Sequence, residues 1–123
     1  PKGNSIFIFE AAGLCIGHLG HLHHEPDAAQ YAALGRLDVV MANADGGQSL
    51  DLATMKRVLT RLKASIVIPM HWVGRGTINP FLADMSETYV IENTGANSIE
   101  VSLRTLPDRP TVVVLQPRFL TPE

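Results

Sequence analysis

Short apolar runs alternate with polar, glycine-containing segments along the whole chain. β-Branched and aromatic residues at 5–10 and a second apolar run at 14–18, joined by Ala12-Gly13, predict a β-hairpin. Nearly continuous apolar runs at 37–42 and 64–72 are typical of buried strands with both faces covered. Further strands are predicted by three apolar stretches, at 88–91, 99–103 and 112–115.

Helical patterns separate several of these runs. Glu25-Pro26-Asp27 predicts a helix start, with Pro26 near the first helical position, residues 28–34 as the helix and Gly35 as its cap. Ser49 is a candidate cap for a second helix. Its apolar stripe, typical of a helix face packed on a core, consists of Leu52, Met55, Val58, Leu59 and Leu62. A short helical piece is expected around 80–85. The alternation predicts one α/β domain over residues 1–123.

Composition narrows the class of protein. The 123 residues are 46% hydrophobic, which suffices for one core, and the net charge is −2. No basic stripe of the kind that follows phosphates is present, so nucleic acid is not expected as a partner. The single Cys15 excludes an intrachain disulfide and suits a reducing compartment. No apolar run reaches the length of a membrane span and no signal peptide is evident, so the expected location is the cytoplasm.

Histidines are concentrated in one short stretch. Four of the five lie within residues 17–24, namely His18, His21, His23 and His24. A lone histidine is more often a surface or satisfied core residue than a ligand, but four together have few such explanations. The cluster is also internal and interrupted by Leu19, Gly20 and Leu22, unlike an added tag. We therefore predict a metal or catalytic site here.

Three chemistry-bearing residues each follow a predicted strand: His21, Asp45 and His71. In layered α/β folds, functional groups collect beyond the carboxyl ends of the strands, where side chains can converge. If these strands are neighbours, the three residues face a common cleft. Asp45 is the weakest candidate of the three, because aspartate before Gly-Gly is more often part of a turn.

The order of these elements resembles the C-terminal half of the metallo-β-lactamase superfamily over roughly residues 4–85. The resemblance rests on the hairpin, the Gly17–His21 loop, the two helices and Ile68-Pro69-Met70-His71-Trp72. The closest branch is that of the lactonase-like and N-acyl-phosphatidylethanolamine phospholipase-like hydrolases. It implies half of an αββα sandwich, a mixed sheet with helices on one face. The N-terminal half would be absent, which agrees with a chain that starts at Pro1 without methionine.

The resemblance also implies a ligand set. Gly20-His21 stands where the family usually has Gly-Asp, whose carboxylate bridges two metal ions, and His71 matches a later ligand. Because neutral imidazole brings no charge and binds through one nitrogen, one ion, or two bridged only by water or hydroxide, is expected. His24 is the candidate second ligand or proton-transferring group. Zinc suits imidazole ligands best, with iron, nickel and manganese as alternatives.

The family's main ligand motif, His-x-His-x-Asp-His, is absent. Residues 21–26 imitate it, but Glu25 and Pro26 occupy the places of the aspartate and last histidine. The missing ligands would come from an N-terminal half, a second chain or a symmetry partner, so a homo-oligomer stays open. The expected activity is metal-dependent hydrolysis of a small-molecule ester, lactone or phosphoester by metal-activated water. The alternatives are a degenerate metal-binding or interaction module and, more remotely, a metal sensor.

Overall fold

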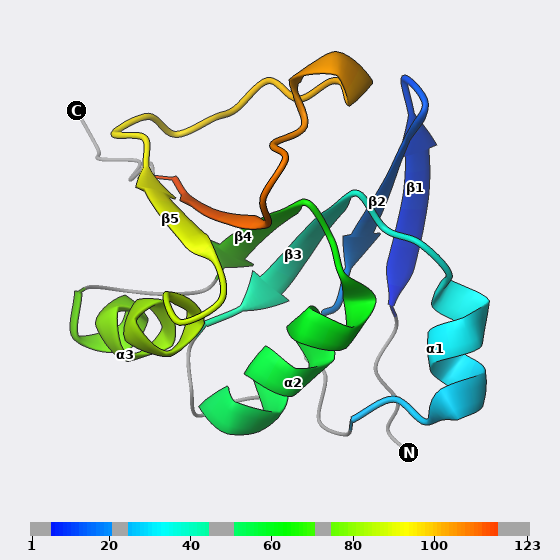
Figure 1. The fold of residues 1–123 in the computed structure, drawn as a ribbon, viewed down its shortest axis with the longest axis horizontal. Coiled ribbons are helices and arrows are strands. Elements are labelled where there is room, and N and C mark those ends of the chain that lie inside the picture. The colour runs from blue at the N-terminus through cyan, green and yellow to red at the C-terminus, as the bar shows by residue number, and fades with distance from the viewer. Residues whose placement is uncertain (1–5, 21–24, 45–50, 71–74, 116–123) are drawn as a thin grey trace, which may run out of the picture.

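A computed structural model of the protein describes residues 6–20, 25–44, 51–70 and 75–115. Its centre is a six-stranded sheet in the order β1-β2-β3-β4-β6-β5 (Figure 1). The strands are β1 (Phe7–Ala11), β2 (Leu14–His18), β3 (Val39–Asn43), β4 (Ile66–Met70), β5 (Val90–Asn93) and β6 (Thr111–Val114). β1 and β2 form an antiparallel hairpin, and all other pairs are parallel. The predicted hairpin and the predicted mixed α/β sheet are therefore confirmed.

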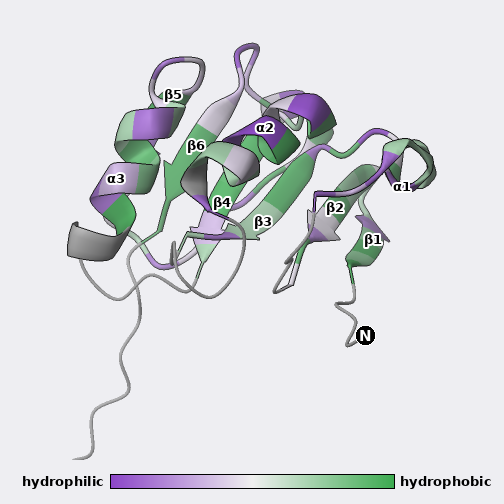
Figure 2. Cartoon of the chain, turned by 90° about the horizontal axis from the view of Figure 1, so that it is seen from below, coloured by the Kyte–Doolittle hydropathy of each residue, from purple (hydrophilic) through white to green (hydrophobic). Residues whose placement is uncertain are grey.

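Three α-helices of the described chain cover one face of this sheet. They are α1 (Ala28–Leu34), α2 (Leu52–Leu62) and α3 (Arg75–Met85). The predicted stripe of α2 is buried, with Met55, Val58 and Leu59 almost inaccessible to solvent, while the side chain of Leu52 lies outside the description. These residues pack on the central strands, which are predominantly hydrophobic in Figure 2, and the burial of this face provides most of the core. None of the described helices is long and apolar enough to cross a membrane.

Part of the second face of the sheet is covered by an irregular segment that leads from β5 to β6. Ile99, Val101 and Leu106 pack there against a small cluster formed by Val39, Ile66 and Val113. The prediction of a strand at 99–103 is wrong, because this segment contains only the short 3₁₀ helix η1 (Leu103–Thr105). β6 already pairs with β4 on one side and β5 on the other, and the segment packs its apolar side chains on the face of the sheet without pairing with an edge strand.

Helix boundaries differ from the predicted ones in three places. Asp27 is the N-cap of α1 and forms a capping box with Gln30, so Pro26 lies before the helix and not at its first position. The N-cap of α2 is Asp51, whose carboxylate accepts a hydrogen bond from the Thr54 amide. Ser49, the predicted cap, lies outside the described residues. α3 begins at Arg75 and contains Pro80, so it is longer than the expected piece at 80–85.

Gly17 in β2 shows how closely the hairpin packs on the loop before β3. A Cβ atom at this buried position would lie 2.8 Å from Cδ1 of Leu37, a side chain that is itself only 1% exposed. We expect Gly17→Ala to lower the free energy of unfolding by about 1–2 kcal/mol through overpacking. Urea denaturation would measure the loss, which should shrink in a Leu37→Val background. An unchanged midpoint would mean that Leu37 moves aside without cost.

Candidate functional site

Three segments of the chain leave the sheet at one edge. β2, β3 and β4 are adjacent and parallel, so their carboxyl ends lie side by side. The alignment continues just beyond the strands, where the Leu19 amide donates to the Met41 carbonyl at 3.1 Å and the Ala44 amide to the Met70 carbonyl at 2.9 Å. The three strands are therefore neighbours, which is the condition that the sequence analysis set for a common cleft.

The predicted ligands begin directly after these aligned positions. His21, His23 and His24 follow Gly20, Asp45 follows Ala44, and His71 follows Met70. All five lie outside the described residues, so their roles stay predictions. Within the described ranges no group of three His, Cys, Asp or Glu side chains could hold a metal ion.

His18, the one described histidine, is engaged by the backbone. Its Nδ1 atom accepts a hydrogen bond from the Gly20 amide at 3.0 Å. Nδ1 therefore uses its lone pair, and in the neutral ring the proton lies on Nε2. Neither nitrogen of the neutral ring can then bind a metal while this hydrogen bond persists. His18 shapes the exit of β2, together with Gly20, whose φ of +64° suits a residue without a side chain.

Glu25, the residue directly after the histidine-rich stretch, forms an ion pair with Arg57 of helix α2. Its Oε1 atom accepts hydrogen bonds from Nε and Nη2 of Arg57 at 3.0 and 2.9 Å. The Arg57 guanidinium lowers the pKa of this carboxyl below its ordinary value. Tyr31 of α1 lies beside the pair, with its hydroxyl 3.5 Å from Glu25 Oε2, and the Arg61 guanidinium lies 4.3 Å from the centre of the Tyr31 ring.

Sequence reasoning took Glu25 as part of a helix start and as the residue in the place of the motif's aspartate, and it missed this contact. Glu25 and Arg57 are 32 positions apart, and no local pattern links them. The only available signal was indirect. Arg57 and Arg61 lie one turn apart on α2, so both could reach a neighbour on the same side of the helix.

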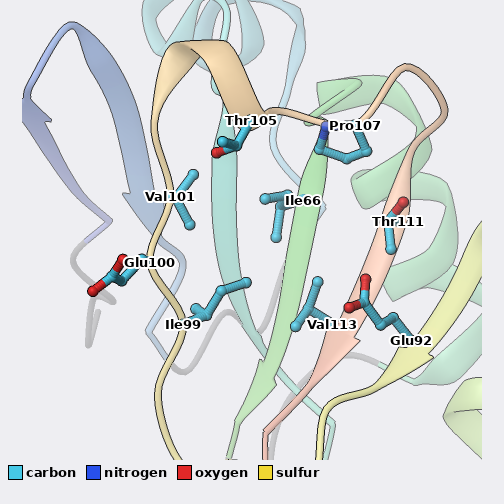
Figure 3. A pocket seen from close by; sticks show the side chains of 9 residues that line it. All are labelled: Ile66, Glu92, Ile99, Glu100, Val101, Thr105, Pro107, Thr111 and Val113. Carbon is cyan, nitrogen blue, oxygen red and sulfur yellow. The ribbon is translucent and has the colours of Figure 1, made fainter.

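A pocket of about 260 Å³ lies on the second face of the sheet, under the irregular segment (Figure 3). Its walls are mostly apolar, and Ile66 and Thr111, the first residues of β4 and β6, belong to its lining. Val113 and Glu92, the third residues of β6 and β5, also belong to the lining, and none of the described lining residues is a predicted metal ligand.

Comparison with known proteins identifies the family. No curated protein matches this chain. A crystal structure of a candidate Zn-dependent hydrolase of the metallo-beta-lactamase superfamily from Thermotoga maritima is similar, with a TM-score of 0.71 and 29% sequence identity. The similarity covers 89% of this chain and only 57% of that one. The beta-lactamase superfamily domain matches residues 1–71 of the 123. The match covers more than half of the chain, which therefore belongs to the beta-lactamase superfamily.

Proposed function

We propose that the protein is a metal-dependent hydrolase whose metal ion is held by His21, His24 and His71. The observation that carries this proposal is the adjacency of β2, β3 and β4, whose carboxyl ends lie side by side shortly before His21, Asp45 and His71 in the sequence. In α/β proteins this is where ligands and catalytic groups gather. The similarity to a candidate Zn-dependent hydrolase supports the same assignment.

The donor set fits a borderline-soft transition metal. Imidazole nitrogens suit zinc, and suit iron, nickel and manganese less well, while His21 in place of a bridging carboxylate favours a single ion. When bound, such an ion acidifies a water molecule and polarises the oxygen of an ester, lactone or phosphoester. His71 and His21 would hold the ion from two strand ends. His24 would be a further ligand or would transfer a proton to the leaving group.

The proposal needs ligands from outside this chain, since the chain spans 57% of its structural relative. An uncovered part of the sheet's second face supports such a partner. The strand register places Phe7, Phe9 and Ile16 on this face, together with Met41 and Ile68. Phe7 and Phe9 are 56% and 49% exposed, and the other three are only partly buried. We infer that residues 1–123 are the C-terminal half of one domain, and that an N-terminal half or a second chain packs here.

The proposal also includes the substrate class, a small ester, lactone or phosphoester, and a narrower branch of the superfamily. We place the protein with the lactonase-like and N-acyl-phosphatidylethanolamine phospholipase-like hydrolases because of Ile68-Pro69-Met70-His71-Trp72. The single Cys15 supports a cytoplasmic location for the enzyme.

The decisive experiment compares metal content and hydrolysis in the protein that contains this chain. Metal would be quantified by elemental analysis, and hydrolysis would be assayed with bis(p-nitrophenyl) phosphate and with γ-butyrolactone. We expect bound zinc, activity on one of the two compounds, loss of activity after chelation and recovery when zinc is returned. Tight metal binding without turnover of either compound would instead favour the degenerate binding module. No bound metal would contradict both functions.

A further inference from the structure

We propose that the pocket on the second face of the sheet binds a small organic amine. The apolar part of this ligand would lie between the irregular segment and the sheet, and its ammonium group would bind to Glu92. The residues that carry the proposal are all described, and none is a proposed metal ligand. The proposal therefore goes beyond the proposed function and does not depend on it.

The pocket has the size and the lining for the apolar part of a ligand. Its volume is about 260 Å³, whereas a water molecule takes up only about 30 Å³ of the liquid and close-packed interiors leave few larger voids. Ile66 and Val113 line the pocket from the sheet and are 4% and 2% exposed. Ile99 and Val101 line it from the irregular segment and are partly buried. Contact with these four side chains favours an apolar group of the ligand.

The irregular segment that forms one wall is fixed in place without a ligand. Ile99, Val101 and Leu106 pack against the sheet from this segment. Between them, the Ser102 amide donates a hydrogen bond to Oγ1 of Thr105 at 3.0 Å, which closes the short helix η1. A preformed pocket of this kind has a smaller ordering cost on binding than one that must form around its ligand.

The polar side chains of the described lining offer acceptors for hydrogen bonds and no unused donor. The Thr111 hydroxyl already donates to the Arg109 carbonyl at 2.9 Å, and the Thr105 hydroxyl donates to the Ser102 carbonyl at 3.3 Å. The other polar side chains of the lining are two carboxylates, which only accept when ionised. No Lys, Arg or His belongs to the described lining. The pocket therefore favours a cation that donates hydrogen bonds, and it disfavours carboxylates and phosphates.

Glu92 is the carboxylate in position to bind this cation. The strand register pairs Glu92 with Val113, so both side chains lie on the second face. In Figure 3 the Glu92 carboxylate lies beside Val113 and Thr111, whereas the Glu100 side chain points away from the other lining residues. Within the described parts of the chain, neither carboxylate has an ion-pair partner. An ammonium group can thus bind to Glu92 without displacing a cation of the protein.

Three probes that share one apolar body and differ in charge test the site. They are 2-phenylethylamine, 2-phenylethanol and phenylacetate, each added to the isotope-labelled protein that contains this chain in a chemical-shift titration. We expect the amine to shift the backbone amides of Ile99, Val101 and Val113, with a Kd on the order of 1 mM for so small a ligand. The alcohol should bind about fivefold more weakly, and the acid should not bind measurably.

Two substitutions in the lining test the role of Glu92. Glu92→Gln should weaken binding of the amine about fivefold and leave binding of the alcohol unchanged. Glu100→Gln is the matched control, because it removes the same charge from a lining side chain that points away from the pocket. Its effect on the amine should stay below about twofold. A purely structural role of Glu92 would change the affinities of amine and alcohol alike, so their ratio is the deciding measurement.

Equal weakening of amine binding by Glu92→Gln and Glu100→Gln would overturn the assignment of Glu92. Equal affinities for all three probes, or no shifts at the lining residues, would overturn the amine site itself. Zinc content and hydrolysis are measured separately, so the proposed hydrolase function would stand after any of these results.

Discussion

Replacing Asp38 with alanine should lower the free energy of unfolding by about 3 kcal/mol, because a buried carboxylate with several partners would be lost. Asp38 is only 3% exposed and lies within an otherwise apolar run. Its Oδ2 atom accepts from the Cys15 amide at 2.8 Å and its Oδ1 atom from Arg36 Nη2 at 2.5 Å. Its own backbone amide and carbonyl also bond to β2 and to the start of β4. Alanine would leave the Cys15 amide without its acceptor where three parallel strands begin.

Urea denaturation monitored by circular dichroism would measure this effect. The control is Asp84→Ala, which removes a half-exposed carboxylate 3.8 Å from Lys56 and should change stability by less than about 0.5 kcal/mol. Asp38→Asn should fall between the two, because the amide oxygen can still accept one of the hydrogen bonds. A loss for Asp38→Ala no larger than that for Asp84→Ala would show that water accepts the hydrogen bond of the Cys15 amide in place of the carboxylate.

Asp38 also marks a limit of sequence reasoning about this fold. The run at 37–42 identified β3 correctly, because a strand covered on both faces must be almost continuously apolar. The same reasoning passed over the one charged residue in that run. Its role depends on contacts with Cys15, with Arg36 and with the start of β4. The hydrophobic pattern within one strand does not predict which other strands pair with it.

The segment at 99–103 shows the opposite error. Ile99 and Val101 alternate with polar residues as in a half-buried strand, and they do bury their side chains on the sheet. Alternation of apolar and polar residues indicates which side chains face the core. It does not indicate whether the backbone pairs with another strand. Here β4 and β5 occupy both sides of β6, and the segment lies across the face of the sheet, so its apolar side chains pack there without a ladder of backbone hydrogen bonds.

The candidate site was predictable to the level of strand ends. The buried runs before His21, Asp45 and His71 predicted three strands, and the structure makes them neighbours with aligned carboxyl ends. The supporting contacts were not predictable. The hydrogen bond from the Gly20 amide to His18 lies in irregular backbone just after β2, and the Glu25–Arg57 pair joins residues 32 positions apart.

Alanine at His21 and alanine at His71 should each weaken zinc binding by roughly 100-fold. A zinc site with four protein ligands binds with about 10–16 kcal/mol, so one ligand accounts for about 3 kcal/mol. The measurement is zinc affinity and zinc content for the two single variants and the double variant. If both imidazoles bind one ion, each single change weakens the same binding event, and the two effects should not be additive.

His18→Asn is the matched control, because it removes an imidazole from the same stretch while an amide oxygen remains to accept the Gly20 hydrogen bond. Its zinc affinity should stay within about threefold of that of the unchanged protein, a shift of less than ~0.7 kcal/mol. Two ions per chain, with each alanine variant losing only one of them, would place His21 and His71 in separate sites. That result would contradict the shared metal site that the adjacency of β2, β3 and β4 supports. Aligned strand ends bring two ligands to one metal ion only if the side chains beyond these ends turn toward a common point.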